Sequence, residues 1–180
     1  MEIGKPNPEW LRRQAAARAH QPKKIKLLIL GESPPAGGSW FYLPGEMDPV
    51  FVQVCTVLFE AEPAGEKEPY LKELKRRGVF YAELKPDAPR QNEKLANYVA
   101  PLTINLGILA PEHLVLVSAE VYQAAFRPLE KAGLPVVDVR VPEPEHEAEF
   151  RQKFRQALVR AELEKLIRPR PKPRPPKTAA

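Results

Sequence analysis

Residues 25–42 read IKLLILGESPPAGGSWFY and pass from a continuous apolar run into a loop rich in glycine and proline. The run at 25–30 lacks the polar alternation of a half-exposed strand, so it predicts a strand covered on both faces, as in parallel sheets. Glu32 follows this strand directly, and two prolines then restrict the backbone. A fixed carboxylate beside the three aromatic residues at 40–42 is what a pocket for a planar ring requires. The plainer interpretation is that Glu32 caps a helix or pairs with an arginine while the aromatics close the core.

The rest of the chain alternates helical patterns with short apolar strands. We expect helices over 7–20, from Asp48 onward, over 68–77, over 92–109 with an interruption at Pro101, over 119–131 and over 147–167, and further strands over 79–84, 113–117 and 135–139. Strands separated by helices indicate βαβ crossovers, a parallel sheet and helices on both faces. A ligand crevice is then expected beyond the carboxyl ends of the strands.

Length and composition indicate one globular domain. The chain has 180 residues, of which 43% are hydrophobic and 28% charged. We expect a single domain over 1–167, with its N-terminal helix inside 1–22, followed by a tail over 168–180 in which proline alternates with basic residues. Many prolines and few amide side chains are typical of thermophile proteins.

Several classes of site and location are disfavoured by the sequence. Cys55 is the only cysteine, and no histidine pair has the spacing of metal ligands, so we expect no metal and no cofactor. No dinucleotide or P-loop motif is present. The longest apolar run is too short to span a bilayer, so no membrane partner is expected. The first residues lack the apolar core of a secretion signal, which predicts a cytoplasmic protein.

The net charge of +5 is unevenly distributed. Residues 1–26 and 168–180 each carry +5, and the stretch 27–167 carries −5. Proteins that bind nucleic acid usually present a basic face. Either the two ends supply phosphate contacts, or no polyanion binds.

Four segments together resemble the uracil-DNA glycosylase superfamily. The stretch Gly31-Glu32-Ser33-Pro34 with the aromatics after it is similar to the first active-site motif of that superfamily. The other three segments are similar to later strands and loops of its iron–sulfur type: FYAELKPDAPRQNEK at 80–94, LGILAPEHLVLVS at 106–118 and VRVPEPEHEAEFRQKF at 139–154. The resemblance implies a three-layer α/β/α fold on a four-stranded parallel sheet, and an enzyme that flips a base from DNA and hydrolyses the N-glycosidic bond.

The resemblance also assigns roles to residues of the first motif. Glu32 matches the acid of the Gly-Glu-x-Pro form and would orient the attacking water. Ser33 stands where the classical enzymes carry their acid, and Pro34 completes the motif. Phe41 or Tyr42 would stack on the base.

The later motifs match less well. Glu83 stands near the position at which active members of the family carry an asparagine that reads the uracil edge. An ionised glutamate offers only acceptors and would favour an amine-bearing base. Pro142 and Glu143 stand where the family carries His-Pro-Ser, so its histidine is missing, as are the four iron–sulfur cysteines. Glu83 and the 142–143 loop would read the edge of the base.

Three hypotheses follow for function. The first is a uracil-DNA glycosylase-like protein that binds a nucleobase in DNA and hydrolyses its glycosidic bond. The second is a non-catalytic module of the same fold that binds nucleic acid, a free nucleobase or a nucleotide. The third is an adaptor in which the tail over 168–180 docks on an aromatic groove or an acidic partner.

Overall fold

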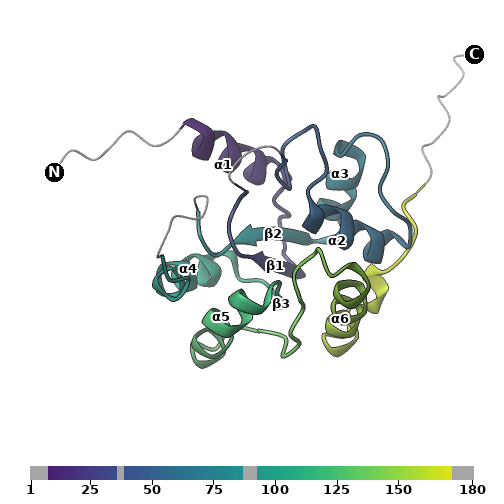
Figure 1. The fold of residues 1–180 in the computed structure, drawn as a ribbon. Helices are drawn as coiled ribbons and strands as arrows, with labels where there is room; N and C mark the ends of the chain where they lie inside the picture. The colour runs from purple at the N-terminus through teal and green to yellow at the C-terminus, as the bar shows by residue number, and fades with distance from the viewer. Residues whose placement is uncertain (1–7, 36–38, 87–92, 172–180) are drawn as a thin grey trace, which may run out of the picture.

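A computed structural model describes residues 8–35, 39–86 and 93–171 of the chain. Its elements, in chain order, are α1 (Pro8–His20), β1 (Leu27–Gly31), α2 (Pro49–Phe59), α3 (Glu68–Arg77), β2 (Val79–Glu83), α4 (Ala96–Leu109), β3 (Leu114–Leu116), α5 (Ala119–Lys131), α6 (Glu147–Arg160) and a short 3₁₀ helix, η1 (Glu164–Leu166). The strands form a parallel sheet in the order β2-β1-β3 (Figure 1). This confirms the expected α/β architecture.

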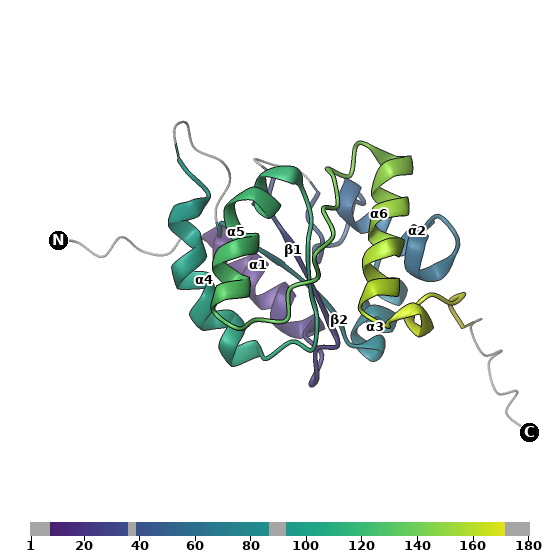
Figure 2. The ribbon, with the colours of Figure 1, turned by 90° about the horizontal axis from the view of Figure 1, so that it is seen from below.

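Helices cover both faces of the sheet. α4 and α5 lie together on one side, and α2 and α6 pack against each other on the other side (Figure 2). β1 is central, and all five of its residues are buried, as its unbroken apolar run predicts.

The sheet has three strands in the described part of the chain, instead of the four expected. The segment 135–141, which includes the expected strand, runs beside β3 and the residue after it, but only isolated parallel bridges join them: Val136 with Leu114 and Val141 with Val117. Between these bridges the N–H of Val139 bonds to the carbonyl oxygen of Val137, two residues back, at 2.8 Å. Such a three-residue turn pinches the backbone and diverts polar groups that a ladder would use.

Local signals place the starts and ends of the helices. The Asp48 carboxylate accepts from the backbone N–H of Phe51 and caps α2. Gly78 ends α3 with a φ of 79°, in the left-handed region that favours glycine. The helix expected over 147–167 ends earlier, at Arg160, because the chain turns at Glu162, which has a φ of 57°.

The segment after η1 packs on the end of α2. The backbone N–H of Arg168 donates to the carbonyl oxygen of Leu58 at 2.9 Å. The guanidinium of Arg170 lies 4.3 Å from the ring centroid of Tyr70. Residues 172–180 of the expected tail lie outside the described residues. Among the helices described, none has the length and apolarity needed to cross a membrane.

Candidate functional site

The carboxyl ends of the strands meet at one edge of the sheet. Gly31, the last residue of β1, is paired with Glu83, the last residue of β2. Beyond this pair the backbone N–H of Lys85 donates to the carbonyl oxygen of Glu32 at 2.8 Å. On the other side of β1, the N–H of Ser118 donates to the carbonyl oxygen of Val141 at 3.0 Å. The loops predicted to carry function therefore leave the sheet side by side.

Glu32 is half-buried at this edge. Burial raises the pKa of its carboxyl group, and the negative charges of Glu120 and Glu143 raise it further, while Lys85 opposes them. A carboxylate with a raised pKa is a stronger base than a solvated one. The raised pKa makes Glu32 a better proton acceptor than a solvated glutamate, at the edge where the sequence predicts a water-orienting acid.

The 142–143 loop lies at the same edge, but the Glu143 side chain already has a structural hydrogen bond. The Glu143 carboxylate accepts from the backbone N–H of Ala119 at 2.9 Å, and the Ser118 hydroxyl accepts from the N–H of Val121 at 3.1 Å. Both side chains cap the start of α5. Ser118 has a φ of 85°, an unusual conformation for a residue other than glycine. Pro142 is half-buried beside Glu143.

Phe41 and Tyr42, the residues expected to stack on a base, lie in the hydrophobic core. Phe41 stacks on the ring of Tyr81, with 4.5 Å between centroids. The Tyr42 hydroxyl accepts from the Tyr81 backbone N–H at 2.6 Å and donates to the Tyr81 carbonyl oxygen at 2.9 Å. Their rings are therefore occupied by protein contacts. In the segment after β1, Ser33 is half-buried and Pro34 is buried.

Glu83 is held by Trp40, the first of the three consecutive aromatics. The indole N–H of Trp40 donates to Oε1 of Glu83 at 2.7 Å. The sequence predicted that Phe41 or Tyr42 would contact the ligand, and it did not predict the contact between Trp40 and Glu83. The only available signal was its place in the 40–42 run.

Glu83 and Trp40 line a groove of about 520 Å³ between α1, α4 and the outer side of β2. We call it the Glu83 groove. Among the described residues that line it are the aromatic residues Trp10, Trp40, Phe80, Tyr81 and Tyr98 and the acid Glu83. Both tryptophans of the chain face it. Gln14, Arg18, Gln21 and Asn105 also line the groove. Aromatic walls with a small number of polar groups are typical of sites for planar ligands.

The Glu83 carboxyl group has an unusual affinity for its proton. Burial raises its pKa to about 8, although the Trp40 hydrogen bond and the positive charge of Arg13 act in the opposite direction. With this pKa the protonated form predominates at neutral pH. The expectation of an amine-bearing base assumed an ionised Glu83, so it does not apply below this pKa.

Gly31 allows an aromatic ring to cross the end of β1. A Cβ atom at this position would lie 2.2 Å from the Tyr81 hydroxyl oxygen. The missing side chain therefore leaves room for the Tyr81 ring at the end of β1.

The expected site residues fall into two groups. Glu32 has Glu120, Glu143 and Lys85 as charged neighbours, whereas Glu83 has Trp40 and Arg13. Lys85 itself is buried, with a side chain 4% exposed, and pairs with Glu93. The two acids thus end adjacent strands, but each has its own surroundings.

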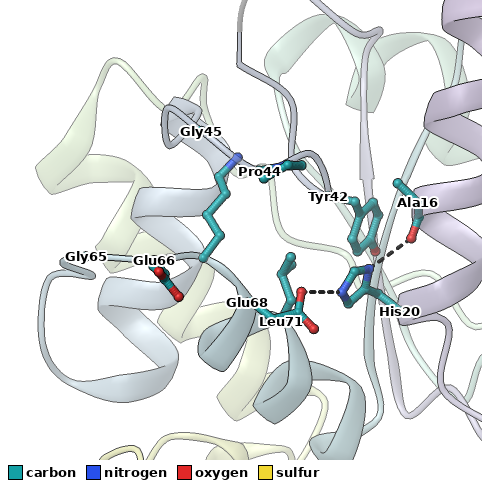
Figure 3. Close-up of a pocket in the computed structure, with 10 residues that line it drawn as sticks. Ala16, His20, Tyr42, Pro44, Gly45, Gly65, Glu66, Glu68 and Leu71 are labelled. Carbon is teal, nitrogen blue, oxygen red and sulfur yellow. Dashed lines mark hydrogen bonds and ion pairs between the residues drawn. The ribbon is translucent and has the colours of Figure 1, made fainter.

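A second cavity, also of about 520 Å³, lies between α1 and α3 (Figure 3). His20 lines one side of it and bridges the two helices: its Nδ1 is 2.9 Å from the carbonyl oxygen of Ala16 and its Nε2 is 3.1 Å from the Glu68 carboxylate. Lys67 is tied to the carbonyl oxygens of Trp40 and Leu43. His20 and Lys67 thus hold structural elements together, and we place the candidate site at the sheet edge and the Glu83 groove.

Within the described residues, no group of three or more His, Cys, Asp and Glu side chains is arranged to hold a metal ion. No protein-family model matches the chain, and no curated protein is found to be similar to it.

Proposed function

We propose that the protein binds a nucleobase in DNA and hydrolyses its N-glycosidic bond, in the manner of a uracil-DNA glycosylase. The observation that carries this proposal is the pairing of Gly31 with Glu83 across β1 and β2, which sets two acids at the ends of adjacent parallel strands. One of these acids faces an aromatic groove. The order of motifs along the chain, from the Gly-Glu-x-Pro loop to the 142–143 loop, adds support.

In this proposal the two acids have separate tasks. A base turned out of the duplex enters the Glu83 groove, because its target atom cannot be reached while it is stacked. Glu83 contacts the edge of the base, and Trp40 fixes the orientation of Glu83. Glu32 orients the water that attacks the sugar carbon. The positive charge of Lys85 lowers the pKa of Glu32 and so opposes the negative charges of Glu120 and Glu143, which raise it.

The test uses DNA oligonucleotides that contain a single uracil, hypoxanthine or xanthine, or a thymine mismatch. The expected product is an abasic site, detected as an alkali-labile break. Replacing the water-orienting acid, Glu32→Gln, should slow the reaction by about 10²-fold or more. Glu130→Gln, at an exposed position of α5, is the matched control. Absence of an abasic product from all four substrates would exclude the hydrolase.

A binding module without catalysis is the second candidate, and the surroundings of Glu32 favour it. Glu143 and Ser118 are engaged in capping α5. Glu120 and Glu143 make the edge acidic, which disfavours a close approach of phosphate. This candidate predicts salt-dependent DNA binding with no abasic product. Undetectable DNA binding at low salt would contradict both candidates.

A further inference from the structure

The hydrogen bond between Trp40 and Glu83 fixes where a proton resides on the carboxyl group. An indole N–H can only donate, so Oε1 of Glu83 must act as the acceptor in the 2.7 Å contact. In the neutral acid the proton is then carried by Oε2. Glu83 lines the groove, so a neutral Glu83 adds an O–H donor to the residues of the groove lining.

The charged and titratable groups around Glu83 come from every neighbouring element. Arg13 of α1 favours ionisation, Asp48 before α2 opposes it, and the Tyr81 hydroxyl of β2 bonds to the carboxylate. Arg18 of α1 and Tyr98 of α4 also line the groove. Burial outweighs the favourable contacts, and the pKa of Glu83 rises to about 8.

We propose that Glu83 presents a neutral carboxylic acid to the groove and thereby selects planar rings that carry a carbonyl oxygen. This inference rests on the proposed function and names the chemistry by which that site chooses its ligand. The aromatic walls hold the ring, and the carbonyl oxygen accepts from Oε2–H. Loss of the proton leaves a negative acceptor opposite the carbonyl oxygen, which is repulsive. Ring binding therefore weakens as the pH rises through the titration of Glu83.

The test measures quenching of tryptophan fluorescence by free uracil and free cytosine. Both tryptophans line the groove, so the signal reports this site. Uracil should bind with an affinity that is constant on the acidic side of the titration and falls up to about tenfold per pH unit above about pH 8. Cytosine keeps one of the two carbonyl oxygens of uracil and carries an amine in place of the other, so it should bind more weakly than uracil on the acidic side.

The decisive variant is Glu83→Gln, because an amide keeps one donor and one acceptor at every pH. Its affinity for uracil should show no break near pH 8, whereas Glu130→Gln should retain the break. Circular dichroism checks that each variant is folded. If Glu83→Gln does not fold, the wild-type pH profile and the cytosine comparison decide the question.

Three results would overturn the inference: a uracil affinity that is flat or rises with pH, a break that persists in Glu83→Gln, or no uracil binding. The abasic-site assay tests the proposed hydrolase independently of this inference. Uracil binding with the expected break but without cleavage would remove the hydrolase and leave the role of Glu83 standing. Cleavage with a KM that is unchanged through pH 8 would remove the role of Glu83 and leave the hydrolase standing.

Discussion

Tyr42 stabilises the outer edge of the sheet with a single hydroxyl group. β2 is an edge strand, so its outward backbone groups have no neighbouring strand to bond with. The Tyr42 hydroxyl satisfies both the N–H and the carbonyl oxygen of Tyr81. The hydroxyl of a residue that the sequence suggested for ligand stacking is therefore engaged in the fold, although the residue also lines the second cavity.

Replacing Tyr42 by Phe should lower the free energy of unfolding by about 1–3 kcal/mol, because two buried backbone groups of Tyr81 lose their partner. Urea denaturation measures the change. Tyr122→Phe is the matched control, since its hydroxyl bonds to Asp138 at an exposed position and its loss should cost less. Equal effects of the two substitutions would show that the Tyr42 hydroxyl does not stabilise the edge.

At the scale of elements, Arg77 joins three segments that are distant in the sequence. Its side chain, at the end of α3, is 0% exposed and pairs with Glu73. Its Nη1 donates to the carbonyl oxygens of Leu58, in α2, and Leu166, in η1. The planar guanidinium can reach these groups together, which a lysine ammonium cannot do. Arg77 therefore holds the C-terminal segment against α2 and α3.

We expect Arg77→Lys to destabilise the protein by about 1–3 kcal/mol, because buried carbonyl oxygens lose their donors. Arg76→Lys provides the control on the neighbouring residue: Arg76 bonds to the same Glu73, but its side chain is 57% exposed. That change should stay within about 0.5 kcal/mol. Similar losses in the two variants would mean that the bonds to Leu58 and Leu166 contribute little.

At the scale of the whole molecule, the sequence predicted the features that local patterns encode. The apolar run before Glu32 identified the central strand, and Ser118 identified the start of α5. The sequence could not show that Trp40, among three adjacent aromatics, contacts Glu83, because that bond spans 43 residues. The protonation of Glu83 was equally hidden, since it follows from burial in the folded chain.

The charge distribution of the whole molecule sets how DNA could approach. The acidic stretch 27–167 includes the sheet edge, whereas α1, at the rim of the Glu83 groove, adds exposed arginines such as Arg18. α1 and α6 lie on well-separated parts of the molecule (Figures 1 and 2). If DNA presents its base to the groove, the phosphates must pass close to α1 rather than α6.

This arrangement predicts different effects of two arginine substitutions on DNA binding. Each phosphate contact contributes about −0.9 to the slope of log affinity against log salt concentration for duplex DNA. If Arg18 contacts one phosphate, Arg18→Gln should therefore reduce the magnitude of this slope by about 0.9. Arg155→Gln, on α6, removes the same charge and should leave the slope unchanged. Fluorescence anisotropy with a labelled duplex measures both slopes. If Arg155→Gln reduces the magnitude of the slope more than Arg18→Gln does, the DNA binds on the face of α6, away from the Glu83 groove.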